Sequence, residues 1–317
     1  MDEARRDQPQ EDDRGDRDEA LARMFTQVRP RLVGIAYAVV GTLAEAEDVV
    51  SDCWLRLAAA DRQDRILDVE AWSTVAVARR ALDVLRSARV QRQAYVGPWL
   101  PEPLLGDGGV SNDPADRVTL DESVSFALMV VLETLSPAER TAWVLHEVFA
   151  LPFPEIAVVV GRSPSAVRQL AVRARAHVAA AAVRVKVVTA EHDRAVAAFL
   201  RAASEGDLPG LIAVLDPAVV LTSDGGGRTG VARRPVHGAD RVARFLIGIR
   251  DKGGSALRVT PTTVNGGPGF IVRDGSVVTT VCALTVLEGR VHRVDLVLAP
   301  NKLPRSRLPA EPGRGSG

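Results

Sequence analysis

Residues 136–178 carry the pattern of successive short helices separated by tight turns, and this pattern constrains the chain more than any other. Ser136 can cap a helix whose first residue is Pro137, and Glu139 is placed to reach back and complete a capping box. Gly161 ends a second helix that starts near Pro154, and a Ser-Pro pair at 163–164 begins a third. The order predicts a helix-turn-helix.

The third helix of this segment has an apolar side and a basic side. Its predicted inner stripe is Val167, Leu170, Ala171 and Ala174, and its outer side is Ser165, Arg168, Gln169, Val172 and Arg173. Between Arg162 and Arg175 there are four arginines and no acid. Arginine and glutamine read base edges and phosphates in the major groove, so Ser165, Arg168, Gln169 and Arg173 are candidate DNA contacts. A helical hairpin with a solvated basic face is the plainer alternative.

The composition of the chain restricts how the DNA-binding interpretation can hold. The 317 residues allow two or three domains, and 46% hydrophobic content supports real cores. The net charge is zero, so any nucleic-acid signal must be local. Cys53 and Cys282 lie far apart and are expected to be small core residues, so we expect no disulfide, metal or cofactor. No stretch is apolar enough to span a membrane, and the charged start excludes a secretory signal, so a cytoplasmic protein is expected.

The N-terminal third is expected to be helical after a disordered start. Residues 1–20 hold nine acids and four arginines and predict a disordered acidic arm. An amphipathic helix follows over 21–39, and Thr42 with Glu45 predicts a second capping box. The helix after that box runs to about residue 60 and keeps acids on its outer side. After a charged loop over 61–69, a further helix runs from about Glu70 to Gln91. It ends in a basic patch that is either a second nucleic-acid contact or an exposed helix end, formed by Arg79, Arg80, Arg86, Arg89 and Arg92.

A proline-rich linker over 93–120 separates this part from the helix-turn-helix. It contains Trp99 and Leu100 between prolines, and two apolar side chains would be costly to leave exposed. We therefore expect this piece of the linker to dock on a surface of the protein.

The region 188–303 has a different pattern. Two helices come first, and valine-rich runs interrupted by Asn-Gly, Asp-Gly and Glu-Gly then predict antiparallel strands and hairpins. Helices packed on one face of such a sheet form an α+β cone. Residues 304–317 are expected to be a disordered tail.

Three motifs in this order resemble a known family. Residues 44–55, Ala-Glu-Ala-Glu-Asp-Val-Val-Ser-Asp-Cys-Trp-Leu, resemble region 2 of an extracytoplasmic-function sigma factor, and 136–178 resemble its region 4. The Trp-Leu-Pro-Glu-Pro linker and the Asp-Gly-Gly-Gly-Arg loop at 224–228 resemble a sigma-J-type subgroup with a C-terminal SnoaL-like domain. The resemblance implies two all-α sigma domains, region 2 over 21–92 and region 4 over 121–183, followed by an α+β SnoaL-like (NTF2-like) cone over 188–303.

The resemblance also implies roles and partners. The partners would be core RNA polymerase, through its β′ clamp helices and β flap, and promoter DNA, without a membrane and without a separate anti-sigma factor. Asp48, Ser51 and Asp52 would bind the clamp helices, although the family commonly has Gln where this chain has Ser51. Arg79, Arg80, Arg86 and Arg89 would serve the minus-ten element, and the candidate contacts of the third helix would face the minus-thirty-five element. The C-terminal domain would regulate in cis through an interface of Trp99, Leu100, Asp224, Gly225, Gly226, Gly227, Arg228, Lys302 and Leu303. A family motif Asn-Pro-Asp-Lys-Leu stands here as Ala-Pro-Asn-Lys-Leu at 299–303, with two positions changed.

Two other functions remain open at this point. A one-component transcription regulator could sense a ligand with its C-terminal domain, and a SnoaL-type isomerase or cyclase could be fused to a DNA-binding module. Catalysis in such a cone needs an acid or base plus an oxyanion donor, often tyrosine, but Tyr37 and Tyr95 both lie outside the domain. His237, His292, Asp224 and Asp295 are the candidates that remain. We expect no catalytic residues, because a histidine flanked by strand valines is more often structural than catalytic and a cis-acting regulatory surface fits this domain best. The acidic helix over 45–58 separates the alternatives, because a simple repressor has no use for a polymerase-binding face.

Overall fold

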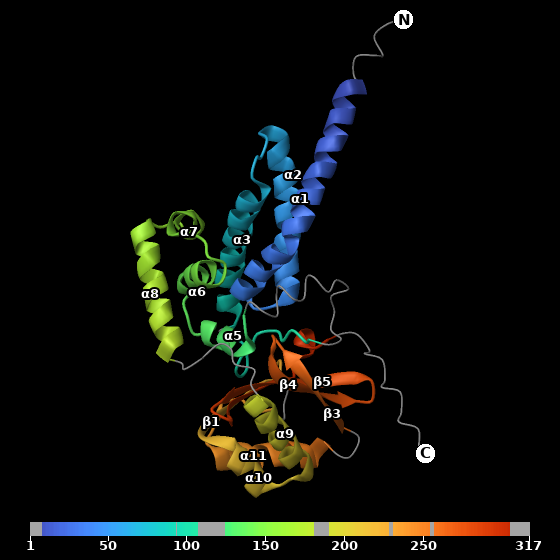
Figure 1. Ribbon diagram of the computed structural model, residues 1–317, viewed down its shortest axis with the longest axis vertical. Helices are drawn as coiled ribbons and strands as arrows, with labels where there is room; N and C mark the ends of the chain where they lie inside the picture. The colour runs from blue at the N-terminus through green and yellow to red at the C-terminus, as the bar shows by residue number, and fades with distance from the viewer. Residues whose placement is uncertain are drawn as a thin grey trace, which may run out of the picture. The chain divides into compact units, whose positions relative to one another are not determined.

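The computed structural model divides into two compact units, one formed by Met1–Ala88 with Leu135–His177 and one by Arg89–Thr134 with Val178–Gly317 (Figure 1). The structure describes residues 8–92, 94–106, 124–180, 190–227, 231–253 and 257–304. None of the helices in these ranges is long and apolar enough to cross a membrane.

The first unit begins with three long helices. They are α1 (Gln8–Val40), α2 (Leu43–Gln63) and α3 (Val69–Arg92), whose last residues belong to the second unit. The side of α2 predicted to face inward is buried at Val49, Val50, Cys53 and Leu57. Burial raises the pKa of the Cys53 thiol to about 11, as expected for a core cysteine. Together the apolar faces of these helices form a core and leave their charged faces outside.

The start of α1 corrects one prediction. We expected a disordered arm over 1–20, but α1 begins at Gln8, and of that arm only residues 1–7 lie outside the described ranges. Arg17 explains the difference, because its Nη2 contacts Asp61 Oδ1 at 2.5 Å and also donates to the carbonyl of Ile66 at 3.0 Å. The composition of residues 1–20 cannot predict these contacts, because their partners lie more than 40 residues away.

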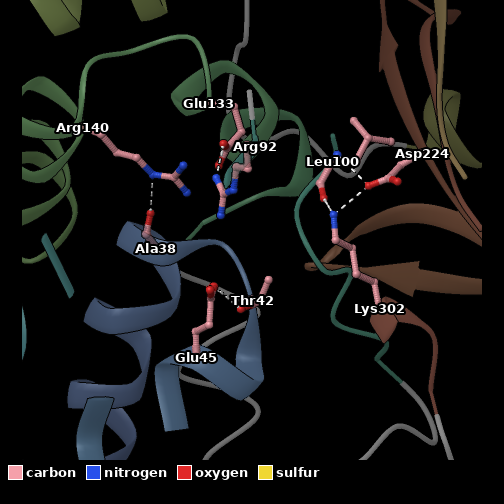
Figure 2. Close-up of polar contacts among 9 residues, drawn as sticks. All are labelled: Ala38, Thr42, Glu45, Arg92, Leu100, Glu133, Arg140, Asp224 and Lys302. Atoms are coloured by element: carbon pink, nitrogen blue, oxygen red, sulfur yellow. Dashed lines mark hydrogen bonds and ion pairs between the residues drawn. The ribbon is translucent and has the colours of Figure 1, made fainter. Parts of the chain in front are cut away.

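The start of α2 corrects a second prediction. Gly41, at φ 92°, ends α1 as expected. The hydroxyl of Thr42 donates to the carboxylate of Glu45 at 2.6 Å, and Thr42 makes no side-chain bond to the helix backbone. The predicted capping box is therefore replaced by a contact between two side chains (Figure 2).

The helix-turn-helix segment forms α6 (Pro137–Trp143), α7 (Phe153–Val160) and α8 (Pro164–Ala180). The capping box of Ser136 and Glu139 is present, which confirms the predicted start of α6. Gly161 adopts φ 71° and ends α7, as predicted. A π-helical turn, η1 (Val144–Val148), follows α6 and was not predicted. It leads to Ala150 at φ 57°, a conformation that alanine rarely adopts. No neighbouring residue in the sequence predicts this conformation.

The second unit contains a six-stranded sheet in the order β2-β1-β6-β5-β4-β3. All neighbouring strands are antiparallel except β1 and β6, which are parallel and place Thr222 beside Asp295. The mixed sheet with its helices confirms the predicted α+β class. The strands are β1 (Leu215–Asp224), β2 (Val236–His237), β3 (Leu257–Val264), β4 (Gly267–Asp274), β5 (Val277–Leu287) and β6 (Arg290–Val297).

The two faces of this sheet are covered by different parts of the chain. Helices α9 (Ala190–Glu205), α10 (Leu208–Val214) and α11 (Ala239–Gly253) cover one face, around a core that includes Phe199, Phe270 and Cys282 (Figure 1). The opposite face carries a second apolar cluster, completed by Leu100 and Leu105 of the linker and by Phe126 of the short helix α5 (Phe126–Leu132). We call this opposite face the linker face. The linker therefore forms part of a core, as its apolar residues predicted.

Candidate functional site

The acidic side of α2 lies on the surface. Asp48 and Ser51 are exposed and Asp52 is half-buried. Asp52 Oδ2 pairs with Arg56 at 3.1 Å and with Arg80 at 3.2 Å, so one predicted polymerase contact is linked to one predicted DNA contact. Leu55, one helical turn beyond Ser51, is 67% exposed, and its side chain extends this surface with an apolar group. We did not single out Leu55 from the sequence, although its spacing indicates it.

Of the predicted arginines at the end of α3, Arg92 is half-buried, the other four are exposed, and their contacts differ. Arg86 pairs with the nearby Asp83 at 3.4 Å. Arg79 donates from Nε and Nη2 to the carbonyl of Val158 on α7, at 3.1 and 2.9 Å. A predicted minus-ten contact is thus engaged by the helix-turn-helix of the same unit.

A buried arginine provides a second bond between these two parts of the first unit. Arg140 on α6 is 1% exposed, and its Nε donates to the carbonyl of Ala38 near the end of α1 at 3.0 Å (Figure 2). Arg31 on α1 donates to the carbonyl of Phe149 at 3.2 Å. The helix-turn-helix is therefore held against the first three helices by arginine bonds to backbone carbonyls.

The recognition helix α8 has the two sides that the sequence predicted. Its apolar stripe is buried, and Ser165, Arg168, Gln169, Val172 and Arg173 are exposed. Arg168 lies over the ring of Phe153 at 5.2 Å, and Arg173 pairs with Glu139 at 3.0 Å. The helix presents a basic outer surface that can enter a DNA groove.

Asp224, at the end of β1, is the centre of a buried polar cluster that we call the clasp. Its carboxylate accepts a bond from the hydroxyl of Tyr95. It also accepts bonds from the backbone N–H of Leu100 at 2.9 Å and from Lys302 Nζ at 2.7 Å, which Figure 2 shows. Lys302 Nζ also donates to the carbonyl of Leu100 at 2.5 Å. Asp224 is fully buried and Lys302 is 3% exposed. Two segments distant in sequence thus meet at one carboxylate.

Trp99 adds an aromatic layer to the clasp. The ammonium group of Lys302 lies 3.8 Å from the centre of the Trp99 ring, and the guanidinium of Arg92 lies 3.5 Å from it. Arg92 also pairs with Glu133, just after α5, at 2.7 Å (Figure 2). Cation–π contacts of this kind stabilise by about 0.5–2 kcal/mol, more when water is excluded.

The glycine loop supports the clasp through its backbone. Gly226 and Gly227 have φ of 64° and 81°, and a Cβ on Gly226 would lie 3.1 Å from the Cα of Ala299. The loop therefore needs glycine to pass close to the C-terminal segment. Leu303 packs against the apolar cluster of the linker face, and Arg228 lies outside the described residues.

Burial governs the titration of the clasp. It lowers the pKa of Lys302 to about 8, although Asp224 opposes this change. Burial, together with the hydrogen bond to Asp224, raises the pKa of Tyr95. The sequence pointed to Trp99, Leu100, Asp224 and Lys302, which the structure brings together. It did not point to Tyr95 or Arg92 as clasp residues.

Three of the four residues considered for catalysis have separate structural partners. Asp224 is enclosed in the clasp, and Asp295 binds Arg293 at 2.8 Å. Burial raises the pKa of Asp295, and Arg293 opposes the rise. His292 lies 3.4 Å from Asp216, and His237 is exposed on the edge strand β2. Within the described ranges there is no group of three or more His, Cys, Asp or Glu residues able to hold a metal ion.

Comparison with known families identifies two regions of the chain. Residues 24–90 match the family model of Sigma-70 region 2, and residues 125–178 match that of Sigma-70, region 4. The ECF RNA polymerase sigma factor SigJ of Mycobacterium tuberculosis is 39% identical, over 92% of this chain and 97% of its own length. The probable ECF RNA polymerase sigma factor SigI of the same species is 38% identical, over 90% of this chain and 95% of its own.

The three-dimensional fold also matches that of a solved sigma factor. The crystal structure of the Mycobacterium tuberculosis extracytoplasmic function sigma factor SigJ superimposes with a TM-score of 0.71 and 35% identity. The match covers 89% of this chain and 97% of that one, so it includes the C-terminal sheet as well as the helical part.

Proposed function

We propose that this chain, which belongs to the extracytoplasmic-function sigma factors of RNA polymerase, is regulated in cis by its own C-terminal domain. As a sigma factor it binds RNA polymerase and promoter DNA and directs transcription initiation. Membership in a family of initiation factors also decides against the enzyme and the one-component regulator. We propose that it works in the cytoplasm, where its polymerase is.

The observation that supports cis regulation is the clasp. A linker that joins two DNA-binding regions is free to move unless something holds it, and here Leu100 and Tyr95 of the linker bond to Asp224 of the sheet. A proline-rich segment loses little conformational entropy on docking, so the free-energy cost of ordering the linker is small. The clasp therefore limits where regions 2 and 4 can move. Because the restraint is part of the chain, we propose that no separate anti-sigma factor is required.

The polymerase-binding surface that we propose is the outer side of α2. Asp48, Ser51 and Asp52 lie on one side of the helix, where Leu55 adds an exposed apolar contact. We propose that this surface binds the β′ clamp helices and that region 4 binds the β flap.

Promoter binding is proposed to require separation of regions 2 and 4. The minus-ten and minus-thirty-five elements are about 25 base pairs apart, which is roughly 85 Å along B-form DNA. Arg79 is bonded directly to the helix-turn-helix at Val158. While Arg79 is bonded to Val158, it cannot reach the minus-ten element at the same time as α8 reads the minus-thirty-five element. The bond between Arg79 and Val158 must therefore break before the arginines of α3 and the helix α8 bind the promoter together. These arginines are Arg79, Arg80, Arg86 and Arg89.

Transcription in vitro with purified core polymerase tests cis regulation. The full chain is compared with Trp99→Ala and Tyr95→Phe, which remove the stacked ring and the hydroxyl donor of the clasp. We expect both variants to change the amount of transcript and to expose the linker to limited proteolysis. Phe substitution leaves the size of residue 95 unchanged, so its effect reports the bond to Asp224. Asp274→Asn, at an exposed site on β4, serves as the control.

The two parts of the proposal can fail separately. Wild-type transcription and wild-type linker protection in both clasp variants would refute cis regulation through the clasp. Absence of promoter-specific transcript with the wild-type chain and with both clasp variants on any template, in contrast, would count against its action as a sigma factor.

A further inference from the structure

Asn265, in the turn between β3 and β4, makes contacts that no predicted site includes. It is 1% exposed although it occupies the tip of a hairpin, where side chains normally face solvent. Its φ of 48° and that of Gly266, 68°, are those of a two-residue type I′ turn. Since Asn-Gly turns need no tertiary contact to form, the burial of this side chain requires another explanation.

The side chain and backbone of Asn265 hold two other segments. Leu104 of the linker donates to Asn265 Oδ1 at 3.0 Å and accepts from the Asn265 backbone N–H at 2.8 Å. Asn265 Nδ2 donates to the carbonyl of Val124, just before α5, at 3.4 Å. Leu105, the next residue of the linker, forms a β-bridge to Val264 and extends these contacts. One turn of the sheet thus fixes the end of the docked linker and the start of α5.

Helix α5 is also held along its length and at its end. Phe126 is 3% exposed within the apolar cluster of the linker face, and Val130 packs against the same cluster. At the end of the helix, Glu133 pairs with Arg92, whose guanidinium stacks on Trp99 of the clasp. Residues 125–178 match sigma region 4, so α5 is the first helix of that region. The sheet therefore holds the first helix of region 4.

We propose that the linker face is a docking site for α5, anchored by Asn265, through which the C-terminal domain holds region 4 at a point other than Asp224. This inference rests on the proposed cis regulation and adds a second point of control to it. The clasp acts on the middle of the linker, whereas the α5 dock acts on the DNA-binding region itself. Release of region 4 then requires α5 to leave Asn265 and the sheet.

The chain offers a closely matched pair of variants for a test. Asn265→Gly keeps the left-handed backbone without strain and removes only the amide side chain. Glu288 occupies the same position in the Glu-Gly turn between β5 and β6, with φ 50°, and is exposed. Glu288→Gly makes the same backbone change at a turn without the amide grip. Val130→Ala loosens the dock from the helix side, and because alanine favours helix more than valine does, weaker helix propensity cannot explain its effect.

Hydrogen exchange of the full chain is measured over the α5 amides, followed by transcription with core polymerase. Loss of the side-chain hydrogen bonds of Asn265 to Leu104 and Val124 predicts α5 exchange roughly tenfold faster or more in Asn265→Gly, with a similar direction in Val130→Ala and no change in Glu288→Gly. We also expect Asn265→Gly to change transcription. Unchanged α5 exchange in Asn265→Gly and Val130→Ala would overturn the dock. Faster exchange with wild-type transcription would overturn its regulatory role.

The result also separates this inference from the clasp. If Tyr95→Phe and Trp99→Ala leave transcription unchanged while Asn265→Gly alters it, the clasp fails and the dock stands. If the clasp variants alter transcription and Asn265→Gly does not, the dock fails and the clasp stands.

Discussion

Replacing Asp224 with asparagine removes the counter-charge of a buried ammonium group and keeps the size of the side chain. Burial has already lowered the pKa of Lys302 from 10.5 to about 8 with Asp224 in place. Without Asp224, Lys302 can lose its proton. The free-energy loss of the docked clasp therefore cannot exceed the cost of removing that proton. The limit is about 1.4 kcal/mol for each pH unit below the wild-type pKa, hence about 1.4 kcal/mol at pH 7 and about 2.7 kcal/mol at pH 6. The variant is therefore expected to weaken the clasp most in mildly acidic solution.

The stability of the wild-type clasp also depends on pH. Lys302 binds its proton less tightly in the docked clasp than in an open chain, because its pKa of about 8 lies below 10.5. Docking then releases a proton between these two values, and the clasp gains stability as the pH rises through this window. Arg92 and Glu133 act on Lys302 in opposite directions, lowering and raising its pKa respectively. The charge lost in Asp224→Asn thus matters below pH 8 and ceases to matter above about pH 9.

Hydrogen exchange of linker peptides spanning 94–106, corrected for the intrinsic pH dependence of exchange, measures the clasp directly. The charge contribution predicts that Asp224→Asn speeds exchange up to about tenfold at pH 7 and up to about a hundredfold at pH 6. Loss of acceptor strength adds a factor that does not depend on pH. Asp274→Asn should match the wild type throughout. An effect of equal size at pH 6 and pH 8.5, or one that grows with pH, would refute the reasoning.

Three further predictions concern single sites. Gly226→Ala should weaken linker docking by about 1–3 kcal/mol, seen as faster proteolysis, and should exceed Gly275→Ala, which has a similar φ of 58° but no atom within 4 Å of the new Cβ. Arg168→Ala should cost on the order of 1–3 kcal/mol in promoter binding if it reads a base, or reduce the salt slope by about one if it contacts phosphate. Intact binding and salt dependence would show that α8 is misassigned. Asp48→Lys should weaken core polymerase binding by on the order of 1 kcal/mol in a titration in which Glu19→Lys, on the exposed side of α1, has no effect.

Local sequence signals predicted the elements whose causes are themselves local. The capping box at Ser136, the left-handed Gly161 and the hairpin glycines are decided by neighbours within a few residues, and the structure contains them. The α8 stripe also followed from spacing alone. The same signals were insufficient at Thr42, where the hydroxyl binds the Glu45 carboxylate instead of the backbone.

Contacts between distant segments account for what the sequence did not predict. Residues 8–20 read as an acidic arm because nothing nearby reveals that Arg17 bonds to Asp61, 44 positions away. Tyr95 was set aside as lying outside the C-terminal domain, yet it donates to Asp224 across 129 positions. Asn265 read only as a turn residue, since its bonds to Leu104 and Val124 depend on where the sheet places the turn. The apolar residues of the linker predicted docking but could not identify the docking partner.

The order of synthesis gives the clasp a consequence in time. Lys302 follows Leu100, whose carbonyl it binds, by 202 positions. At about 5–20 residues per second, a ribosome needs roughly 10–40 s to travel that distance. During this interval region 2 and the linker have been made but Lys302 has not, so the nascent chain is unrestrained by the clasp. Each new molecule therefore passes through an open state before it can close, and the rate of translation sets how long that state lasts.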